Sequence, residues 1–337
     1  MSKTVFNPSQ IDFNRPGKHT YEVAFHHDGA WGYVLLPVTV INGLAAKGKH
    51  VVCFGGNHGN EYEGQVVVRR LTHELQPEKM KGRVILIPQL NPPACKQRMR
   101  ESPLDGVNMN RAFPGNPRGT ITYRIAHFVT KWIFPQVDVV LDIHAAGEGL
   151  EFALCTSFHT IKDPKQRAEM KKVAGLFDTP LIFLYSSEMA SGLLVEEAEK
   201  LEKITIGGEF GHSAGVNYTG VTHAYEGIRN VLKYYGVLPG KITKVNPHRK
   251  TPPVLVEALK LESYIPAPFS GVYEPAVPVG SAVKEGQLLG RLYDFERPDI
   301  SPLEINALRS GYLIAQTFRS PVLRGDTMIV VGGKVEE

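Results

Sequence analysis

The sequence has little cysteine. Only 3 of its 337 residues are cysteine, an odd number that cannot pair completely, so a small fold built on a framework of disulfides is excluded. Two of the three, Cys53 and Cys155, lie in apolar strand-like runs. Buried, reduced thiols are typical of a cytoplasmic protein, and that is the location we expect.

Long apolar runs and a strong charge of either sign are also missing. No apolar run is long enough to span a bilayer, and the first twenty residues have no positive segment followed by an apolar core, so we expect no membrane contact and no secretory signal. The net charge is only +4, and no basic run is interleaved with aromatic residues, which argues against nucleic acid as a partner. The length allows one large domain and a smaller one.

What the sequence does contain is an alternation of two patterns between about residues 20 and 237. Apolar strand-like runs occupy 33–41, 51–56, 83–90, 137–144, 181–185 and 204–210, and helical spacing occupies 62–75, 121–134, 165–177 and 224–236. Strands that are apolar throughout and separated by helices predict a largely parallel sheet covered on both faces. The expected fold is therefore an α/β sandwich whose ligand site lies beyond the carboxyl ends of the strands.

The composition changes after a Pro- and Lys-rich segment at 238–252, which we interpret as a linker. Short β-like runs punctuated by glycine follow it and predict a small all-β domain. Its Ser-Gly-Val (270–272), Val-Lys-Glu-Gly-Gln (283–287) and Ser-Gly-Tyr (310–312) segments resemble the half-repeats of biotinyl and lipoyl carrier domains. No lysine stands between Lys284 and Lys334 to carry a cofactor, so we expect a structural role.

The segment GGNHGNEYEG at 55–64 joins a strand to a helix. His58 and Glu61 are three residues apart, so both side chains can face one point at the first turn of that helix. An imidazole and a carboxylate are suitable ligands for Zn²⁺, and a hydrolytic site needs a third protein ligand and an open position. The alternative is a glutamate favoured by the helix dipole beside a turn histidine.

A third ligand is available at the end of the run VDVVLDIH. His144 ends this strand at the sheet edge where the 55–61 turn also lies, and Asp142 shares its strand face. A carboxylate there can orient a ligating imidazole. A strand-end histidine bonded to backbone is the alternative, but the three residues in combination favour a metal site.

Two further segments carry polar groups near the same edge. The long loop 91–115 holds Arg100 and the adjacent Asn110 and Arg111, an amide and a planar fork suited to binding a carboxylate, or else to pinning the loop by salt bridges. Glu209 lies at an apolar strand end, where it can act as a general base that moves a proton from water to a leaving amine.

In this order, these segments resemble the succinylglutamate desuccinylase/aspartoacylase family, a deacylase branch of the zinc carboxypeptidase superfamily. The matching motifs are Gly-Gly-x-His-Gly-x-Glu (55–61), Asn-Pro-x-Ala (91–94), Asn-x-Asn-Arg (108–111), Asp-x-His (142–144) and Glu-Phe-Gly (209–211). The resemblance covers nearly the whole chain, including the lipoyl-like tail. The longer segments are most similar to the bacterial subgroup that includes N-acetyl-diaminobutyrate deacetylases.

The resemblance implies a zinc carboxypeptidase-like mixed sheet between helices at 1–245 and a small lipoyl-like β domain at 246–337. It implies that one Zn²⁺ per chain is bound by three ligands, that an arginine polarises the scissile carbonyl, that an Asn-Arg pair holds the substrate carboxylate, and that a glutamate is the base. In this sequence those residues are His58, Glu61 and His144; Arg100; Asn110 and Arg111; and Glu209.

The predicted activity is hydrolysis of the amide bond of a small N-acylated amino acid. Asn108 stands where aspartoacylases carry an acidic residue, which weakens any assignment to N-acetylaspartate. Two other functions stay open: a metallocarboxypeptidase acting on small peptides, and a non-catalytic binding protein. The β domain adds strand edges and apolar surface, which favours a homo-oligomer.

Overall fold

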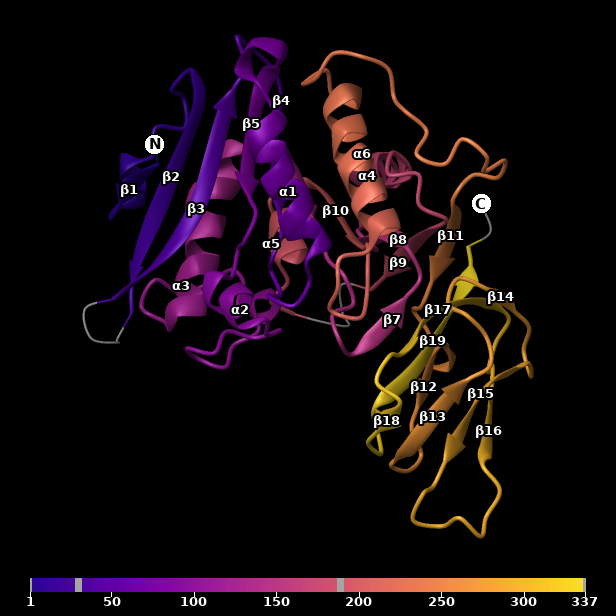
Figure 1. The fold of residues 1–337 in the computed structure, drawn as a ribbon. Helices are drawn as coiled ribbons and strands as arrows, with labels where there is room; N and C mark the ends of the chain where they lie inside the picture. The colour runs from indigo at the N-terminus through magenta and orange to yellow at the C-terminus, as the bar shows by residue number, and fades with distance from the viewer. Residues whose placement is uncertain (1, 28–31, 187–190, 336–337) are drawn as a thin grey trace.

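The structure is a computed structural model that describes residues 2–27, 32–186 and 191–335 (Figure 1). Its N-terminal part is built from eleven labelled strands and six labelled α-helices within those ranges. The strands are β1 (Lys3–Val5), β2 (Gly17–His26), β3 (Tyr33–Asn42), β4 (Ala45–Phe54), β5 (Lys81–Ile87), β6 (Val139–Asp142), β7 (Leu150–Phe152), β8 (Cys155–His159), β9 (Leu181–Tyr185), β10 (Ile204–Glu209) and β11 (Val254–Glu257). The helices are α1 (Glu63–Glu74), α2 (Pro92–Gln97), α3 (Ile121–Phe128), α4 (Pro164–Gly175), α5 (Leu194–Lys200) and α6 (Tyr218–Tyr234).

The main sheet has the strand order β1-β2-β3-β5-β4-β6-β10-β8-β9-β11 before it continues into the C-terminal part. Strands β5, β4, β6 and β10 are parallel neighbours, whereas β2 with β3, β3 with β5, and β10 with β8 are antiparallel. The expected α/β fold with a mixed sheet is confirmed, although fewer strands are parallel than the apolar runs indicated. Strands β2 and β3 are separated by a short connection, which only an antiparallel pair can use.

Helices cover both faces of this sheet. Successive residues of a strand point to opposite faces, and the central strands carry apolar side chains on both. Val52 and Phe54 of β4 pack in a core with α3 and α5, while Val51 and Cys53 pack in a second core with α1, α4 and α6. Figure 1 shows α1, α4 and α6 in front of the strands and α3 behind them. This two-sided burial explains why the strands have no polar face.

The loop predicted at 91–115 contains more structure than expected. Asn91 caps α2 by accepting from the Ala94 backbone N–H at 3.4 Å, and prolines occupy the first helical positions. Helix α6 also begins six residues before the predicted 224, because the Asn217 side chain caps it by accepting from the Gly220 N–H at 2.8 Å.

The C-terminal part is all-β, as predicted. One sheet contains β12 (Tyr264–Pro266), β14 (Ala282–Val283), β17 (Gly311–Thr317) and β19 (Thr327–Lys334), and the other contains β13 (Gly271–Pro275), β15 (Leu288–Tyr293), β16 (Leu303–Asn306) and β18 (Pro321–Val322). Apolar residues of both sheets, including Tyr273 and Leu292, form their common core.

Strand pairing joins the two parts of the chain. Strand β11 pairs with β9 on one side and β19 on the other, and β7 pairs antiparallel with β17. The main sheet therefore runs without a break from the N-terminal part into the C-terminal part. The boundary that we predicted between 245 and 246 lies in a stretch without helix or strand between α6 and β11, and it stays a prediction.

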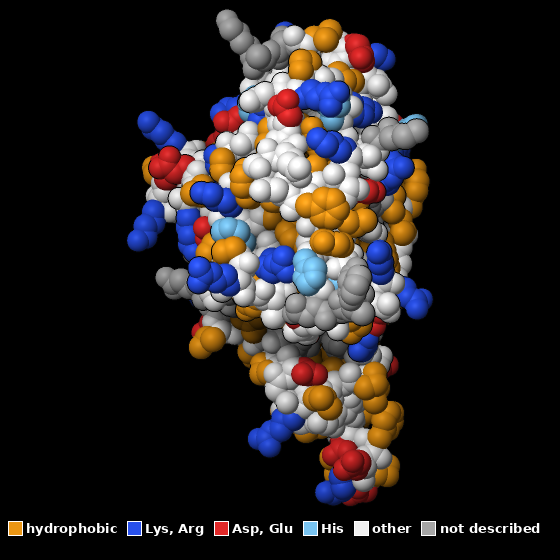
Figure 2. Space-filling model, turned by 90° about the vertical axis from the view of Figure 1, so that its left-hand side faces the viewer, with side chains coloured by type: hydrophobic (Ala, Val, Ile, Leu, Met, Phe, Trp, Pro, Cys, Tyr) orange, Lys and Arg blue, Asp and Glu red, His pale blue; other side chains and the backbone are white. Residues whose placement is uncertain are grey.

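The distribution of charge on the surface agrees with the small net charge of +4. In Figure 2 the C-terminal part is a narrow extension below the wider N-terminal part, and lysines and arginines on the visible face are scattered among other side chains. In the described ranges, no helix combines the length and apolarity needed to cross a membrane.

Gly220 provides a test of how α6 packs on the strand end that carries Glu209. A Cβ at this position would lie 1.4 Å from the backbone oxygen of Phe210, so Gly220→Ala must push the helix off the strand. We expect a loss of about 3 kcal/mol or more in the free energy of unfolding, measured by urea denaturation. Gly175→Ala is the matched control, since its Cβ would meet nothing within 4 Å, and it should change stability by no more than about 1 kcal/mol. Equal effects of the two changes would contradict this packing.

Candidate active site

The site lies at the carboxyl ends of β4, β6 and β10, which are neighbours in the sheet. His58 and Glu61 stand in the turn between β4 and α1, His144 follows β6 by two residues, and Glu209 is the last residue of β10. His144 and Glu209 also form an isolated parallel bridge. The turn after β4 needs glycine, because Gly56 has φ of +65°.

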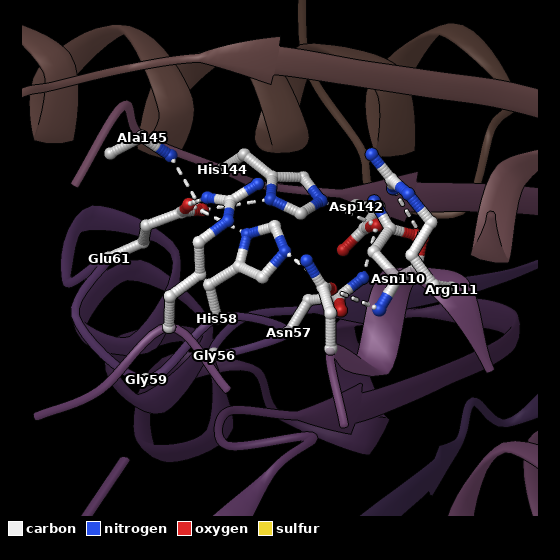
Figure 3. Close-up of polar contacts among 12 residues, drawn as sticks. Gly56, Asn57, His58, Gly59, Glu61, Asn110, Arg111, Asp142, His144 and Ala145 are labelled. Atoms are coloured by element: carbon white, nitrogen blue, oxygen red, sulfur yellow. Dashed lines mark hydrogen bonds and ion pairs between the residues drawn. The ribbon is translucent and has the colours of Figure 1, made fainter. Parts of the chain in front are cut away.

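Two imidazoles face one carboxylate, as Figure 3 shows. Nδ1 of His58 lies 2.7 Å from Oε1 of Glu61, and Nδ1 of His144 lies 2.8 Å from Oε2. One ligand atom from each of the three residues falls within 4.8 Å of the others. Two imidazole nitrogens and a carboxylate are the donor set of many catalytic zinc sites, so the residues present fit the predicted metal.

The second nitrogen of each ring has its own acceptor. Nε2 of His144 lies 2.8 Å from Oδ2 of Asp142, and Nε2 of His58 lies 3.1 Å from Oδ1 of Asn108. Asn57 donates to the same Asp142 oxygen at 2.9 Å. When the Nε2 protons are donated to Asp142 and Asn108, each ring keeps an Nδ1 lone pair beside Glu61 that can bind a metal.

The three side chains shift one another's pKa values. Burial acts to lower the pKa of His144, but the charges of Asp142 and Glu61 raise it well above its usual range. Burial alone would raise the pKa of Glu61, but His58 and His144 beside it hold that pKa well below its usual range. Burial lowers the pKa of His58, which favours the neutral imidazole that can bind a metal. The Ala145 backbone N–H also donates to Glu61 at 3.1 Å, so the carboxylate is fixed in place.

Glu209 lines the same cavity as His58, Glu61 and His144. Its Oε2 is buried and has no hydrogen-bond partner among the described residues. Burial, together with the charge of Glu61, raises the pKa of Glu209 to about 8. A raised pKa makes Glu209 a stronger base once it is ionised, so the carboxylate form can take a proton from a reacting group.

All seven residues that the sequence singled out line one cavity of about 510 Å³: His58, Glu61, Arg100, Asn110, Arg111, His144 and Glu209. Arg100 Nη1 donates to Oε1 of Glu61 at 3.0 Å. The Asn110 side chain accepts from the Leu194 N–H at 2.9 Å, which ties the loop to the start of α5. Burial and the nearby Arg100 charge lower the pKa of Arg111, so this end of the cavity favours an anion.

Sequence reasoning missed several groups of the site. Asn57, which holds Asp142, lies inside a motif that was noticed for other residues. Asn108 was noticed only for its bearing on the substrate, and its contact with His58 was not predicted. Tyr185 and Glu148 also line the cavity and carried no pattern of their own. The only available signal for Glu148 was its position four residues after His144. His223 is buried against the Phe177 carbonyl and is not among the residues that line this cavity.

Comparison with known families decides the classification. The model described as the succinylglutamate desuccinylase/aspartoacylase catalytic domain matches residues 47–235. The chain belongs to the succinylglutamate desuccinylase/aspartoacylase family. It is 34% identical to the N-alpha-acetyl-L-2,4-diaminobutyric acid deacetylase of Halomonas elongata over 309 residues, which cover 92% of this chain and 89% of that protein.

Solved structures of the family share the complete fold. A succinylglutamate desuccinylase/aspartoacylase from Rhodobacter sphaeroides superimposes with a TM-score of 0.91 at 33% identity, covering 97% of this chain and 98% of the other. The product-bound ectoine utilization protein EutE (DoeB) from Ruegeria pomeroyi gives 0.89 at 30% identity, covering 96% and 98%. Both matches include the C-terminal β part, so the two-part architecture is shared by these relatives.

Asp142 offers a test of the metal centre that leaves its ligands in place. Asp142→Asn removes the charge that holds the His144 ring, and we expect the affinity for Zn²⁺ to fall about 10- to 100-fold in competition with a chromophoric chelator. Asp138→Asn is the control, because Asp138 precedes the same strand and accepts from the His50 N–H at 2.8 Å instead. An unchanged affinity in Asp142→Asn would show that this carboxylate does not support a metal ligand.

Proposed function

We propose that this protein is a zinc-dependent hydrolase that removes the acyl group from a small N-acylated amino acid. The observation that carries the proposal is the convergence of His58, Glu61 and His144 beside Glu209, whose buried Oε2 has no partner in the described structure. One Zn²⁺ held by the three ligands would act as a Lewis acid and lower the pKa of a water molecule.

The remaining residues of the site act on the substrate in three ways. Glu209 takes the proton from the attacking water and passes it to the amine that leaves. Arg100, whose guanidinium reaches the metal ligand Glu61, stabilises the negative charge that develops on the carbonyl oxygen. Arg111, with Asn110 beside it, binds the α-carboxylate of the substrate and so orients the amide toward the base.

The relatives point to the first substrate to test. The Halomonas elongata protein is named for deacetylation of N-alpha-acetyl-L-2,4-diaminobutyric acid, and the Ruegeria pomeroyi protein for ectoine utilization. We propose N-acetyl-diaminobutyrate as a substrate of this chain on that basis. Hydrolysis of small peptides at their carboxyl ends is the second candidate, since the same Arg111 could hold a C-terminal carboxylate; release of terminal residues from a hexapeptide would favour it.

Two proposals concern the protein as a whole. A cytoplasmic location rests on the reduced state expected of its three cysteines, which are all buried and unpaired in the structure. A homo-oligomer rests on the additional surface of the β domain. Light scattering of the purified protein tests the second, and a monomer at micromolar concentration would contradict it.

Glu209→Gln tests the proposed base. The change keeps the shape of the side chain and removes its ability to take a proton, so kcat on the best N-acyl amino acid should fall about 10²- to 10⁴-fold. Its zinc content should equal that of the unchanged protein, because Glu209 is not a ligand in the proposal. His144→Ala is the contrasting variant and should lose both zinc and activity. Full activity in Glu209→Gln would remove this residue from the mechanism.

A panel of N-acetyl and N-succinyl amino acids, assayed with metal-analysed protein, tests the function itself. Zinc-dependent release of one acyl group that is lost in His144→Ala is the expected result. Stoichiometric zinc without turnover of any member would overturn the deacylase proposal and shift attention to peptides.

A further inference from the structure

One wall of the active-site cavity is formed by a single stretch of chain that follows the metal ligand His144. This wall includes Ala145, Ala146, Glu148, Gly149, Leu150 and Phe152. It begins at the Ala145 N–H, which donates to Glu61, and it ends in strand β7. A substrate whose amide reaches the metal centre must therefore place part of itself against this wall.

Glu148 is the charged residue of the lining that the proposed chemistry does not use. In the described part of the cavity, every other charged or titratable lining group except Tyr185 serves the metal, the base or the carboxylate site: His58, Glu61, Arg100, Arg111, Asp142, His144 and Glu209. Glu148 has an ion pair with Arg319, which belongs to the turn between β17 and β18. Arg319 is not among the residues that line the cavity.

This ion pair leaves the Glu148 carboxylate open to a ligand. The Glu148 side chain is 43% exposed and that of Arg319 is 65% exposed, and ion pairs between exposed groups stabilise a structure by about 1 kcal/mol or less. A ligand cation entering from the cavity can share or replace Arg319 at little cost.

The surface next to Glu148 is apolar. Leu150 and Phe152 continue the same wall, the ring of Phe152 lies 6.4 Å from that of Phe183, and Phe183 stacks on Tyr185 at 5.5 Å. An apolar track that ends in a carboxylate suits a short alkyl stem with a positive tip, because the stem covers apolar surface and the tip meets the charge. The low polarity of the wall also strengthens the attraction between a ligand cation and the Glu148 carboxylate.

We propose that Glu148 is a specificity-determining residue that selects substrates whose side chain carries an ammonium group on a short alkyl stem. The substrate class is thus the Nα-acyl derivatives of diamino acids, with the α-carboxylate at Arg111 and the side-chain ammonium at Glu148. This inference rests on the proposed deacylase function and adds the residue that selects the side chain of the substrate.

The C-terminal domain keeps this wall in position. Strand β17 pairs with β7, the Phe318 N–H donates to the Gly149 carbonyl at 3.1 Å, and the buried Gln316 amide donates to Glu151 at 2.8 Å. These contacts hold the residues that directly follow Glu148, so the carboxylate sits beside an anchored segment.

Three N-acetyl amino acids of similar size test the proposal: the derivatives of 2,4-diaminobutyrate, norvaline and glutamate, which are cationic, neutral and anionic at the side chain. The zinc-loaded protein should have a kcat/KM at least about tenfold higher for the cationic substrate than for the neutral one. Glu148→Gln should lower that ratio about tenfold or more. Glu262→Gln removes a carboxylate from an exposed turn of the C-terminal part, and it should leave the ratio unchanged.

Each other outcome has a definite meaning. An unchanged ratio in Glu148→Gln would overturn the proposal. Preference for the glutamate derivative, lost in Arg319→Gln, would also overturn it and make Arg319 the selecting group. Calorimetric binding of the three compounds to the zinc-loaded protein and to Glu148→Gln separates recognition from turnover. Charge-dependent binding without hydrolysis would refute the deacylase function alone, and absence of both would refute both.

Discussion

The geometry of the site depends on one buried carboxylate, that of Glu61. It lies against Nδ1 of His58 and Nδ1 of His144, and it accepts from the Ala145 N–H and the Arg100 guanidinium. These groups come from the turn after β4, the end of β6 and the loop after α2. A charge buried without partners would be very costly, so the four contacts are required for Glu61 to be there at all.

The sheet is what brings these partners to Glu61. Parallel β4 and β6 are in register, with Phe54 opposite Asp142, and His144 then bridges to Glu209 at the end of β10. Because all three strands end at the same edge, the turn, the histidine and the base meet without long excursions of the chain. The helices packed on both faces fix the strands and thereby the distances among the ligands.

Much of this could be predicted from the sequence, because the information is local. A glycine-rich turn with His58 and Glu61 three residues apart, and His144 two residues after Asp142, is recognisable at strand ends without knowledge of the fold. An α/β sheet covered by helices and the β tail also follow from periodicity and glycine spacing, whereas the mixed strand directions were implied only by the family resemblance. The metal ligands needed no long-range information beyond the rule that parallel strands end together.

What could not be predicted depends on contacts between distant segments. The Asn57 amide is oriented by Asp142, 85 residues away. Strand β7 is three residues long and exists because β17, far along the chain, pairs with it. Strand β8 runs antiparallel to β10, a choice that its apolar residues do not encode. The role of Glu148 likewise depends on a wall that forms only after both parts of the chain have joined.

The β7–β17 pairing separates the chemistry of this protein from its choice of substrate. The candidate metal ligands follow β4 and β6 and the proposed base ends β10, whereas the wall after His144 is held from the other side by the C-terminal part. Sequence changes in β17 or in the turn that follows it can thus reshape the cavity while every metal ligand stays where it is. Evolution of new substrates in this architecture therefore has a route through the tail, a region that takes no part in breaking the bond.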